Sequence, residues 1–238
     1  MATRKKATKK EATVDIATVL AWLKRKGQKK NRDGMARYGI VAQKVFGVPV
    51  GTLRDYAKTI GKSHALALAL WDTGWYEARM LSAFVDEPAL VTPQQMDAWC
   101  KDFDNWAIAD TVCFHLFDKT PHAYKKVKAW AKRRPEFERR ASFALLASLA
   151  LHDKKAEDAL FLPTFALMDQ AADDERNFVK KAVSWALRGV GQRSPELHKR
   201  AIALGQALRD AEDPTRRWIG RDVLRELEKK KPKQKVRT

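Results

Sequence analysis

Two tryptophans and one aspartate are the residues of this sequence with the clearest chemical potential. Trp106 and Asp110 are four residues apart, so on a helix both side chains face the same way. An aromatic face beside a carboxylate is a favourable place for a cation. Trp185 lies on a second apolar segment further along the chain. This pattern indicates stabilisation of positive charge. Aromatic residues at helical spacing are more often core residues, and Asp110 is equally able to pair with a helix end or a lysine.

Basic residues are the second chemical feature. The chain has 238 residues, with 47 Lys and Arg against 29 Asp and Glu, and its formal net charge is +18. Residues 1–30 carry +8, while 119–140 and 214–238 carry +7 each, which leaves −4 for the remainder. The internal block is the informative one, because binding a phosphate backbone requires cations on folded sequence. A solvated helix face explains it equally well. Its candidate DNA contacts are Lys125, Lys128, Lys132, Arg139 and Arg140.

Composition narrows the class of protein. The hydrophobic content of 45% is ordinary for a globular protein, and no apolar run approaches the roughly 20 residues of a membrane span. The basic N-terminus has no apolar segment behind it, so we expect no secretory signal. Cys100 and Cys113 fit no metal or redox spacing and imply a reducing compartment. We therefore expect a cytoplasmic protein with a polyanionic partner, nucleic acid before an anionic membrane surface.

Several common catalytic motifs are absent from the sequence. It contains no P-loop, no nucleophile elbow and no H-E-x-x-H, and Gly189-Val190-Gly191 follows no strand. The five histidines are scattered and lack the spacing of a metal site. We predict no metal and no cofactor. An enzyme built on this chain would work with carboxylates, aromatic rings and basic side chains.

The elements that must position these residues are helices. No β-branched alternation competes with the helical pattern, so the sequence predicts an all-α fold. Thr92-Pro93, Thr120-Pro121, Ser194-Pro195 and Asp213-Pro214 each place a capping residue before a proline that suits the first helical turn. Helical stripes are also predicted from Val14 to Leu23 and from Met35 to Val45. The remaining predicted helices are 51–60, 63–73, 75–85, 93–103, 105–118, 121–134, 135–152, 155–171, 174–191, 194–210 and 215–230.

A weak internal period organises these helices. Trp75, Trp106, Phe137 and Phe178 each lie near the start of an apolar helix, with separations of 31, 31 and 41 residues. Pairs of helices of the HEAT type repeat on this scale. Such a solenoid buries its core between neighbouring repeats and leaves a concave face free, which we expect to be basic. An irregular helical bundle is the alternative.

The domain boundaries follow from composition. We predict one domain over residues 12–230, with a basic and disordered N-terminal tail over 1–11 and a basic C-terminal tail over 231–238.

Five ordered motifs resemble the AlkD-like family of DNA alkylation repair glycosylases, whose members are built from HEAT-like repeats. Together the motifs span roughly residues 32–210, and the last is the most specific. Asn105 and Ala107 depart from the family pattern, which often shows W-W-D at this site. The motifs are Met35-Ala36-Arg37-Tyr38, Leu70-Trp71-Asp72 with Glu77-Ala78-Arg79, Asn105-Trp106-x-x-x-Asp110, Arg140-Ala141 and Lys181-Ala182-x-x-Trp185-x-Leu187-Arg188.

The resemblance implies a monofunctional glycosylase that excises N3- or N7-alkylated purines from duplex DNA, acting as a monomer in base excision repair. It implies that Asp110 stabilises an oxocarbenium ion and orients water. Trp106 and Trp185 would pack against the sugar and backbone. Arg140, with Arg139 as its rival, would hold a phosphate beside the lesion. Weaker candidates for DNA contacts are Arg37, Tyr38 and Arg188.

Two other functions fit the same residues. A non-catalytic relative would bind DNA through the same scaffold without cleaving it. A HEAT-type protein-interaction scaffold would carry its basic charge incidentally. Base release from alkylated duplex DNA distinguishes the glycosylase from the non-catalytic relative. Salt-dependent binding to DNA argues against the protein-interaction scaffold.

Overall fold

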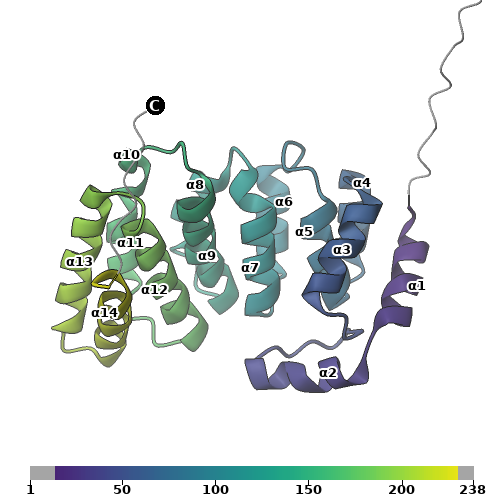
Figure 1. The fold of residues 1–238 in the computed structure, drawn as a ribbon, viewed down its shortest axis with the longest axis horizontal. Helices are drawn as coiled ribbons and strands as arrows, with labels where there is room; N and C mark the ends of the chain where they lie inside the picture. Colours follow the sequence, from purple (N-terminus) through teal and green to yellow (C-terminus); the bar gives the residue numbers. More distant parts are fainter. Residues whose placement is uncertain (1–13, 230–238) are drawn as a thin grey trace, which may run out of the picture.

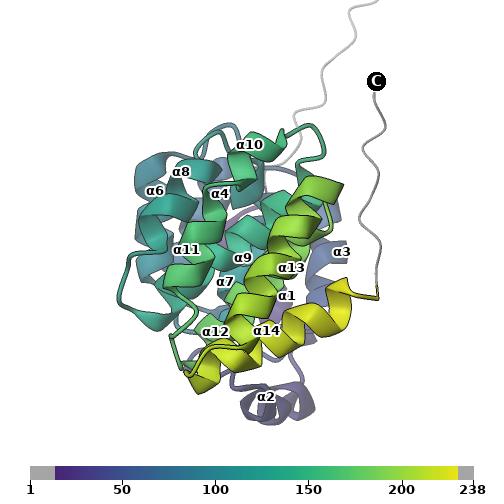
Figure 2. The same cartoon turned by 90° about the vertical axis from the view of Figure 1, so that its left-hand side faces the viewer.

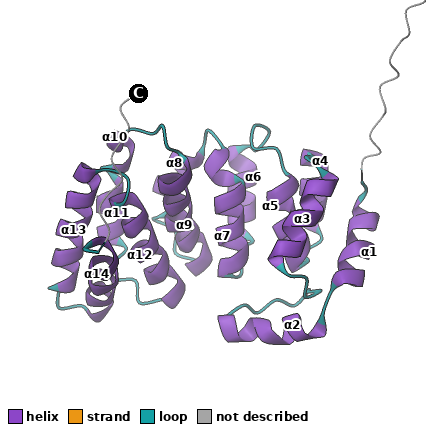
Figure 3. Ribbon diagram, viewed as in Figure 1, coloured by secondary structure: helices purple, strands orange, loops and turns teal. Residues whose placement is uncertain are grey.

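The fold is seen in a computed structural model that describes residues 14–229, so the predicted tails lie outside the described residues. Between residues 14 and 229 the chain is helical and has no strand, which confirms the all-α prediction (Figure 3). None of the described helices is long and apolar enough to cross a membrane. The elements are α1(Ile16–Lys26), α2(Lys29–Met35), η1(Ala36–Tyr38), α3(Val50–Ile60), α4(His64–Asp72), α5(Tyr76–Val85), α6(Pro93–Lys101), α7(Trp106–His115), η2(Phe117–Lys119), α8(Ala123–Trp130), α9(Glu136–His152), α10(Asp158–Phe161), α11(Thr164–Gln170), α12(Asn177–Gly191), α13(Pro195–Arg209) and α14(Pro214–Leu227), where η marks a 3-10 helix.

The helices form two layers that run the length of the molecule. In the inner layer each helix packs on the next, in the order α3, α5, α7, α9, α12 and α14. The outer layer covers this row: α4 packs on α5, α8 on α9, α11 on α12, and α13 on α14. Figure 2 shows α6, α8 and α11 on one side of α7, α9 and α12. In Figure 1 the helices stand side by side, and α2 runs roughly perpendicular to them, below α3 and α5.

Local capping explains several of the helix starts. The side-chain oxygens of Thr92 and Ser194 accept hydrogen bonds from Gln95 N (3.1 Å) and Leu197 N (3.2 Å), as the Thr-Pro and Ser-Pro pairs predict. Asp213 caps α14 in the same way. The prediction at Thr120 is wrong: its hydroxyl donates to the carbonyl of Phe117 within η2, and α8 begins three residues later.

Two predicted helices differ from the structure. The stripe from Met35 to Val45 is not one helix, because α2 and η1 end at Tyr38 and residues 40–49 are irregular. The predicted helix 155–171 is divided into α10 and α11, with Pro163 between them.

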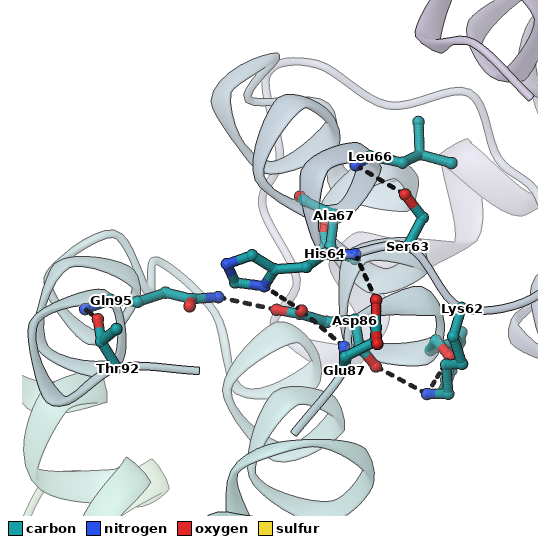
Figure 4. Close-up of polar contacts among 11 residues, drawn as sticks. Lys62, Ser63, His64, Leu66, Ala67, Asp86, Glu87, Thr92 and Gln95 are labelled. Carbon is teal, nitrogen blue, oxygen red and sulfur yellow. Dashed lines mark hydrogen bonds and ion pairs between the residues drawn. The ribbon is translucent and has the colours of Figure 1, made fainter. Parts of the chain in front are cut away.

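A buried aspartate ties three consecutive helices together at one end of the row (Figure 4). Asp86 follows α5 and is fully buried. One carboxylate oxygen lies 2.6 Å from Nδ1 of His64, the first residue of α4, and the other accepts from Nε2 of Gln95 in α6 at 2.8 Å. A second such pair joins Asp118 in η2 to His152 at the end of α9. A buried carboxylate after α5 and another after α7 therefore each join their own helix end to neighbouring helices.

A second buried carboxylate fixes the segment that precedes α3. Glu77, in the first turn of α5, accepts hydrogen bonds from the backbone nitrogens of Phe46 (2.9 Å), Gly47 (2.6 Å) and Val48 (3.1 Å). The ring of Phe46 stacks on Trp75 with centroids 3.9 Å apart. By accepting from all three N–H groups, the carboxylate satisfies backbone donors that a helix would have bonded internally. This contact therefore holds residues 46–48 in a non-helical path just before α3. The helical run itself ends earlier, at Gly39, which caps η1 with a left-handed φ of 68°.

Glu77→Gln tests this role. The amide retains the size of the side chain but loses the charge and turns an N–H group toward backbone donors, so we expect a loss of about 2 kcal/mol in the free energy of unfolding. Urea denaturation measures it. Glu196→Gln is the control, because Glu196 forms only an exposed ion pair with Arg200 and should change stability little. Equal effects of the two substitutions would contradict the role given to Glu77.

Candidate active site

Asn105 places Trp106 at the start of α7. The Asn105 side chain is fully buried and its Oδ1 accepts a hydrogen bond from Ile108 N at 3.0 Å, which is N-terminal capping. The residue that departs from the family pattern thus has a local structural role. Trp106 is half-buried, and its indole N–H donates to the carbonyl oxygen of Tyr38 at 2.8 Å. That bond joins α7 to η1, 68 residues earlier in the chain.

Asp110 lies one turn beyond Trp106 on α7 and forms a two-pronged ion pair with Arg140 of α9. Arg140 Nε donates to one carboxylate oxygen at 2.9 Å, and Nη2 donates to the other at 2.7 Å. The Asp110 side chain is only 18% exposed and the Arg140 side chain only 8%. This fork-to-fork geometry fixes the orientation of the carboxylate.

Arg140 also reaches the next inner helix. Its Nη1 donates to the carbonyl oxygen of Phe178, in the first turn of α12, at 2.6 Å. The guanidinium carbon lies 6.0 Å from the ring centre of Trp106 and 5.9 Å from that of Phe178. One guanidinium therefore joins α7, α9 and α12 and lies close to two aromatic rings.

Gly39 brings the N-terminal segment against the same cluster. Its φ of 68° lies in the left-handed region, and a Cβ at this position would come within 2.8 Å of the Phe178 ring. Both facts require glycine. The cluster is thus assembled from η1, α7, α9 and α12, whose contributing residues span positions 38–178.

The surroundings of Asp110 determine its charge and therefore its possible chemical roles. Burial raises the pKa of this carboxyl, and the adjacent Arg140 lowers it, burial being the larger influence. The fork to Arg140 requires the ionised carboxylate. An aspartate held in this way is suited to stabilise a developing positive charge and to hold a water molecule, rather than to donate a proton.

Trp185 belongs to a stripe along α12 that begins at the cluster. Phe178, Lys181, Trp185 and Arg188 are spaced three or four residues apart and so share one helix face. Trp185 is half-buried and packs against the core, whereas Lys181 is exposed. Arg188 forms ion pairs with Glu226, and with Asp222 at 3.7 Å, both in α14.

The other predicted DNA contacts lie in several places. Arg139 pairs with Asp174 at 2.8 Å. Lys125 and Lys128 are exposed on α8, in the outer layer, and Lys132 is exposed just after it. Tyr38 is 66% exposed. Arg37 lines an open depression of about 560 Å³ together with Lys29, Lys30, Asp33 and Gly34. The role of each of these residues in DNA binding stays a prediction.

Sequence reasoning missed the contributions of two residues. The sequence places Phe178 near the start of an apolar helix, but the pairing of its carbonyl group with Arg140 leaves no trace in the sequence. Gly39 is not among the predicted site residues. The signal that could have found it is its place directly after Met-Ala-Arg-Tyr, because a glycine there is typical of a helix end. Between residues 14 and 229 no group of three or more His, Cys, Asp or Glu gathers in a way that could hold a metal ion.

Comparison with known proteins identifies the family and the fold. Residues 19–233 match the family of DNA alkylation repair enzymes. The chain belongs to this family. The resemblance seen in the five motifs is therefore confirmed.

A solved structure shares the fold. It is described as "A new family of proteins related to the HEAT-like repeat DNA glycosylases with affinity for branched DNA structures". It superimposes with a TM-score of 0.75 and 19% sequence identity, covering 94% of this chain and 99% of that one. The HEAT-like architecture predicted from the period is confirmed at this level. No curated protein gives a significant sequence match.

The Asp110–Arg140 pair predicts a large coupling in stability. Arg140→Met leaves a buried carboxylate without its partner and should lower the free energy of unfolding by about 3 kcal/mol. Adding Asp110→Asn should recover part of that loss, because the unpaired charge is removed. A double-variant cycle by urea denaturation measures the coupling.

Arg139→Met is the matched control. Its partner Asp174 retains a second arginine, Arg176, at 2.5 Å, so the control should cost clearly less than Arg140→Met. Simple additivity of the Asp110 and Arg140 substitutions would show that the pair does not act as a unit.

Proposed function

We propose that this DNA alkylation repair family member is a glycosylase that hydrolyses the N-glycosidic bond of N3- or N7-alkylated purines in duplex DNA. The observation that carries the proposal is the oriented Asp110 carboxylate, one helical turn from the half-buried indole of Trp106. Family membership supports DNA repair in general terms. The substrate and the reaction are those that the resemblance to the AlkD-like glycosylases implies, and the chemistry of these residues supports them.

The reaction suits a site without a strong acid. An alkylated purine already carries positive charge, so the electron pair of the bond between C1′ and the purine nitrogen leaves with a neutral base. Positive charge then develops on the deoxyribose. Asp110 stabilises this oxocarbenium ion and accepts a hydrogen bond from the water that adds to C1′, whose proton passes to solvent.

The remaining residues have supporting roles in this proposal. Trp106 and Trp185 offer aromatic faces to the sugar and backbone, and a cationic sugar favours such faces. Arg140 holds the Asp110 carboxylate in place, and we keep its predicted contact to a flanking phosphate as part of the proposal. Arg139, Arg37, Tyr38 and Arg188 are proposed as further DNA contacts.

One observation favours a second candidate function, DNA binding without cleavage. Both Asp110 oxygens already accept hydrogen bonds from Arg140, and a neutralised carboxylate stabilises a cation less than a free one. The structural neighbour is described by its affinity for branched DNA. A protein that binds such DNA but releases no base would fit this alternative.

Asp110→Asn separates the two functions. The substitution removes the charge and nearly conserves shape, so the single-turnover rate of 7-methylguanine release from duplex DNA should fall about 100-fold or more. Affinity for the same duplex should remain nearly unchanged. Base release quantified by chromatography gives the rate, and fluorescence anisotropy gives the affinity.

Asp97→Asn is the control for the loss of a paired carboxylate. Asp97 accepts from Lys126 and Arg133 at 2.6 Å each and lies on α6, apart from the cluster around Asp110. It should retain the wild-type rate. Base release that is absent in the wild type, with intact DNA binding, would support the second candidate. A wild-type rate in Asp110→Asn would refute the role of the carboxylate.

Charge reversal on and just after α8 tests the internal basic block. Lys125→Glu, Lys128→Glu and Lys132→Glu together should weaken duplex binding and flatten its salt dependence if these residues contact phosphates. The logarithmic slope should fall by about 0.9 for each phosphate that the protein no longer neutralises. Titration across a range of salt concentrations measures the slope. Unchanged affinity and slope would identify the block as a solvated helix face.

A further inference from the structure

A tryptophan at the far end of the inner layer has no role in the site described above. Trp218 lies in the first turns of α14 and is 37% exposed. Lys180 of α12 places its ammonium 5.4 Å from the centre of the Trp218 ring. A single exposed aromatic residue is ordinary on a protein surface, and the cations near this indole are what make it notable. The part of the ring that Lys180 leaves uncovered is open to solvent.

Two further cations lie on the helices that carry this indole and Lys180. Arg221 is exposed and lies three residues from Trp218, on the same face of α14. Lys181 is exposed on α12, which packs against α14 (Figure 2). Within residues 14–229, neither Lys181 nor Arg221 forms an ion pair; the nearby Asp222 is engaged by Arg188 and Arg225. We refer to Lys180, Lys181, Trp218 and Arg221 as the α14 platform.

The α14 platform adjoins the candidate active site through α12. Lys181 lies between Phe178 and Trp185 on one helix face, and the Phe178 carbonyl is bonded to Arg140. The spacing from Phe178 to Lys181 is less than one helical turn, about 4.5 Å along the axis. If DNA is bound at Asp110, one of its strands would therefore lie within reach of the α14 platform.

The chemistry of the platform favours DNA with unpaired bases. Phosphate groups need only cations, and such contacts serve paired and unpaired strands alike. An exposed indole adds a stacking surface, but base faces are hidden inside a paired duplex. Stacking on an aromatic side chain is available only to a base that has left the helix, and it tolerates any base. Combined cations and indole are typical of single-strand binding surfaces.

We propose that the α14 platform binds a single-stranded segment of DNA next to duplex, with Trp218 stacking on an unpaired base and Lys181 and Arg221 contacting its phosphates. The surface acts in binding and takes no part in breaking the glycosidic bond. It is therefore independent of whether the protein is a glycosylase.

The test compares undamaged DNA with and without unpaired bases. The substrates are a blunt duplex and the same duplex with a single-stranded extension on one strand or the other. The wild-type protein should bind one of the extended substrates more tightly. Trp218→Ala should lose this preference, with roughly a tenfold loss of affinity for the extended DNA, and should retain its affinity for the blunt duplex. Arg221→Glu should reduce the salt slope for the extended substrate by about 0.7, because one phosphate is no longer neutralised.

A base analogue reports stacking directly. 2-Aminopurine placed in turn at the unpaired positions should lose fluorescence when the wild-type protein binds, because stacking on the indole quenches it, and should not do so with Trp218→Ala. Trp218→Phe should retain part of the quenching, which a loss of folding would not explain.

Two substitutions in other helices serve as controls. Leu160→Ala removes another exposed apolar side chain, 46% exposed on α10. Lys199→Glu makes the same change of net charge on α13. Neither should alter the preference for extended DNA. Equal affinity of the wild type for blunt and extended DNA, or a preference that survives Trp218→Ala, would overturn the proposal.

Discussion

The candidate site depends most on the interactions of the Arg140 guanidinium. This group donates to Asp110 in α7 and to the Phe178 carbonyl in α12 while belonging to α9. Burying a charge costs several kcal/mol unless it is paired and hydrogen-bonded. Here the cost is offset by a carboxylate on one side and a backbone carbonyl on the other. Because the pairing works only in this geometry, it fixes three successive inner helices relative to one another.

The other half of the site comes from the N-terminal segment, and a second buried charge controls it. Glu77 accepts hydrogen bonds from three backbone N–H groups of residues 46–48, which fixes the end of the segment that joins η1 to α3. The same segment presents the Tyr38 carbonyl to Trp106 and lets Gly39 approach Phe178. Breaking the Glu77 hydrogen bonds would therefore disturb the orientation of Trp106, although Glu77 does not touch it.

These two charges explain which parts of the structure could be predicted from sequence. Helices and their caps depend on neighbours within a turn, so the periodicity located the helices, and Thr92-Pro93, Ser194-Pro195 and Asp213-Pro214 located three of their starts. The shared face of Trp106 and Asp110 is local in the same sense. The predicted helix through Val45 was wrong because Gly39 ends η1 with a left-handed φ, and residues 46–48 are then held outside any helix by Glu77, 29–31 positions away. The partner of Asp110 is 30 residues away, and nothing in the spacing separates Arg140 from Arg139.

The pairing of Asp110 with Arg140 also limits the chemistry open to the site. A carboxylate neutralised by arginine is a poor general base and no acid, so reactions that need a strong proton transfer are disfavoured. A leaving group that is already cationic removes this need. The site can then act by orienting groups around the substrate. The guanidinium occupies one edge of the carboxylate, and this fixes the remaining lone pairs and the faces of Trp106 and Phe178 around it. Such a site uses its binding energy to hold charges in place, which suits a reaction whose transition state differs from its substrate mainly in where the positive charge lies.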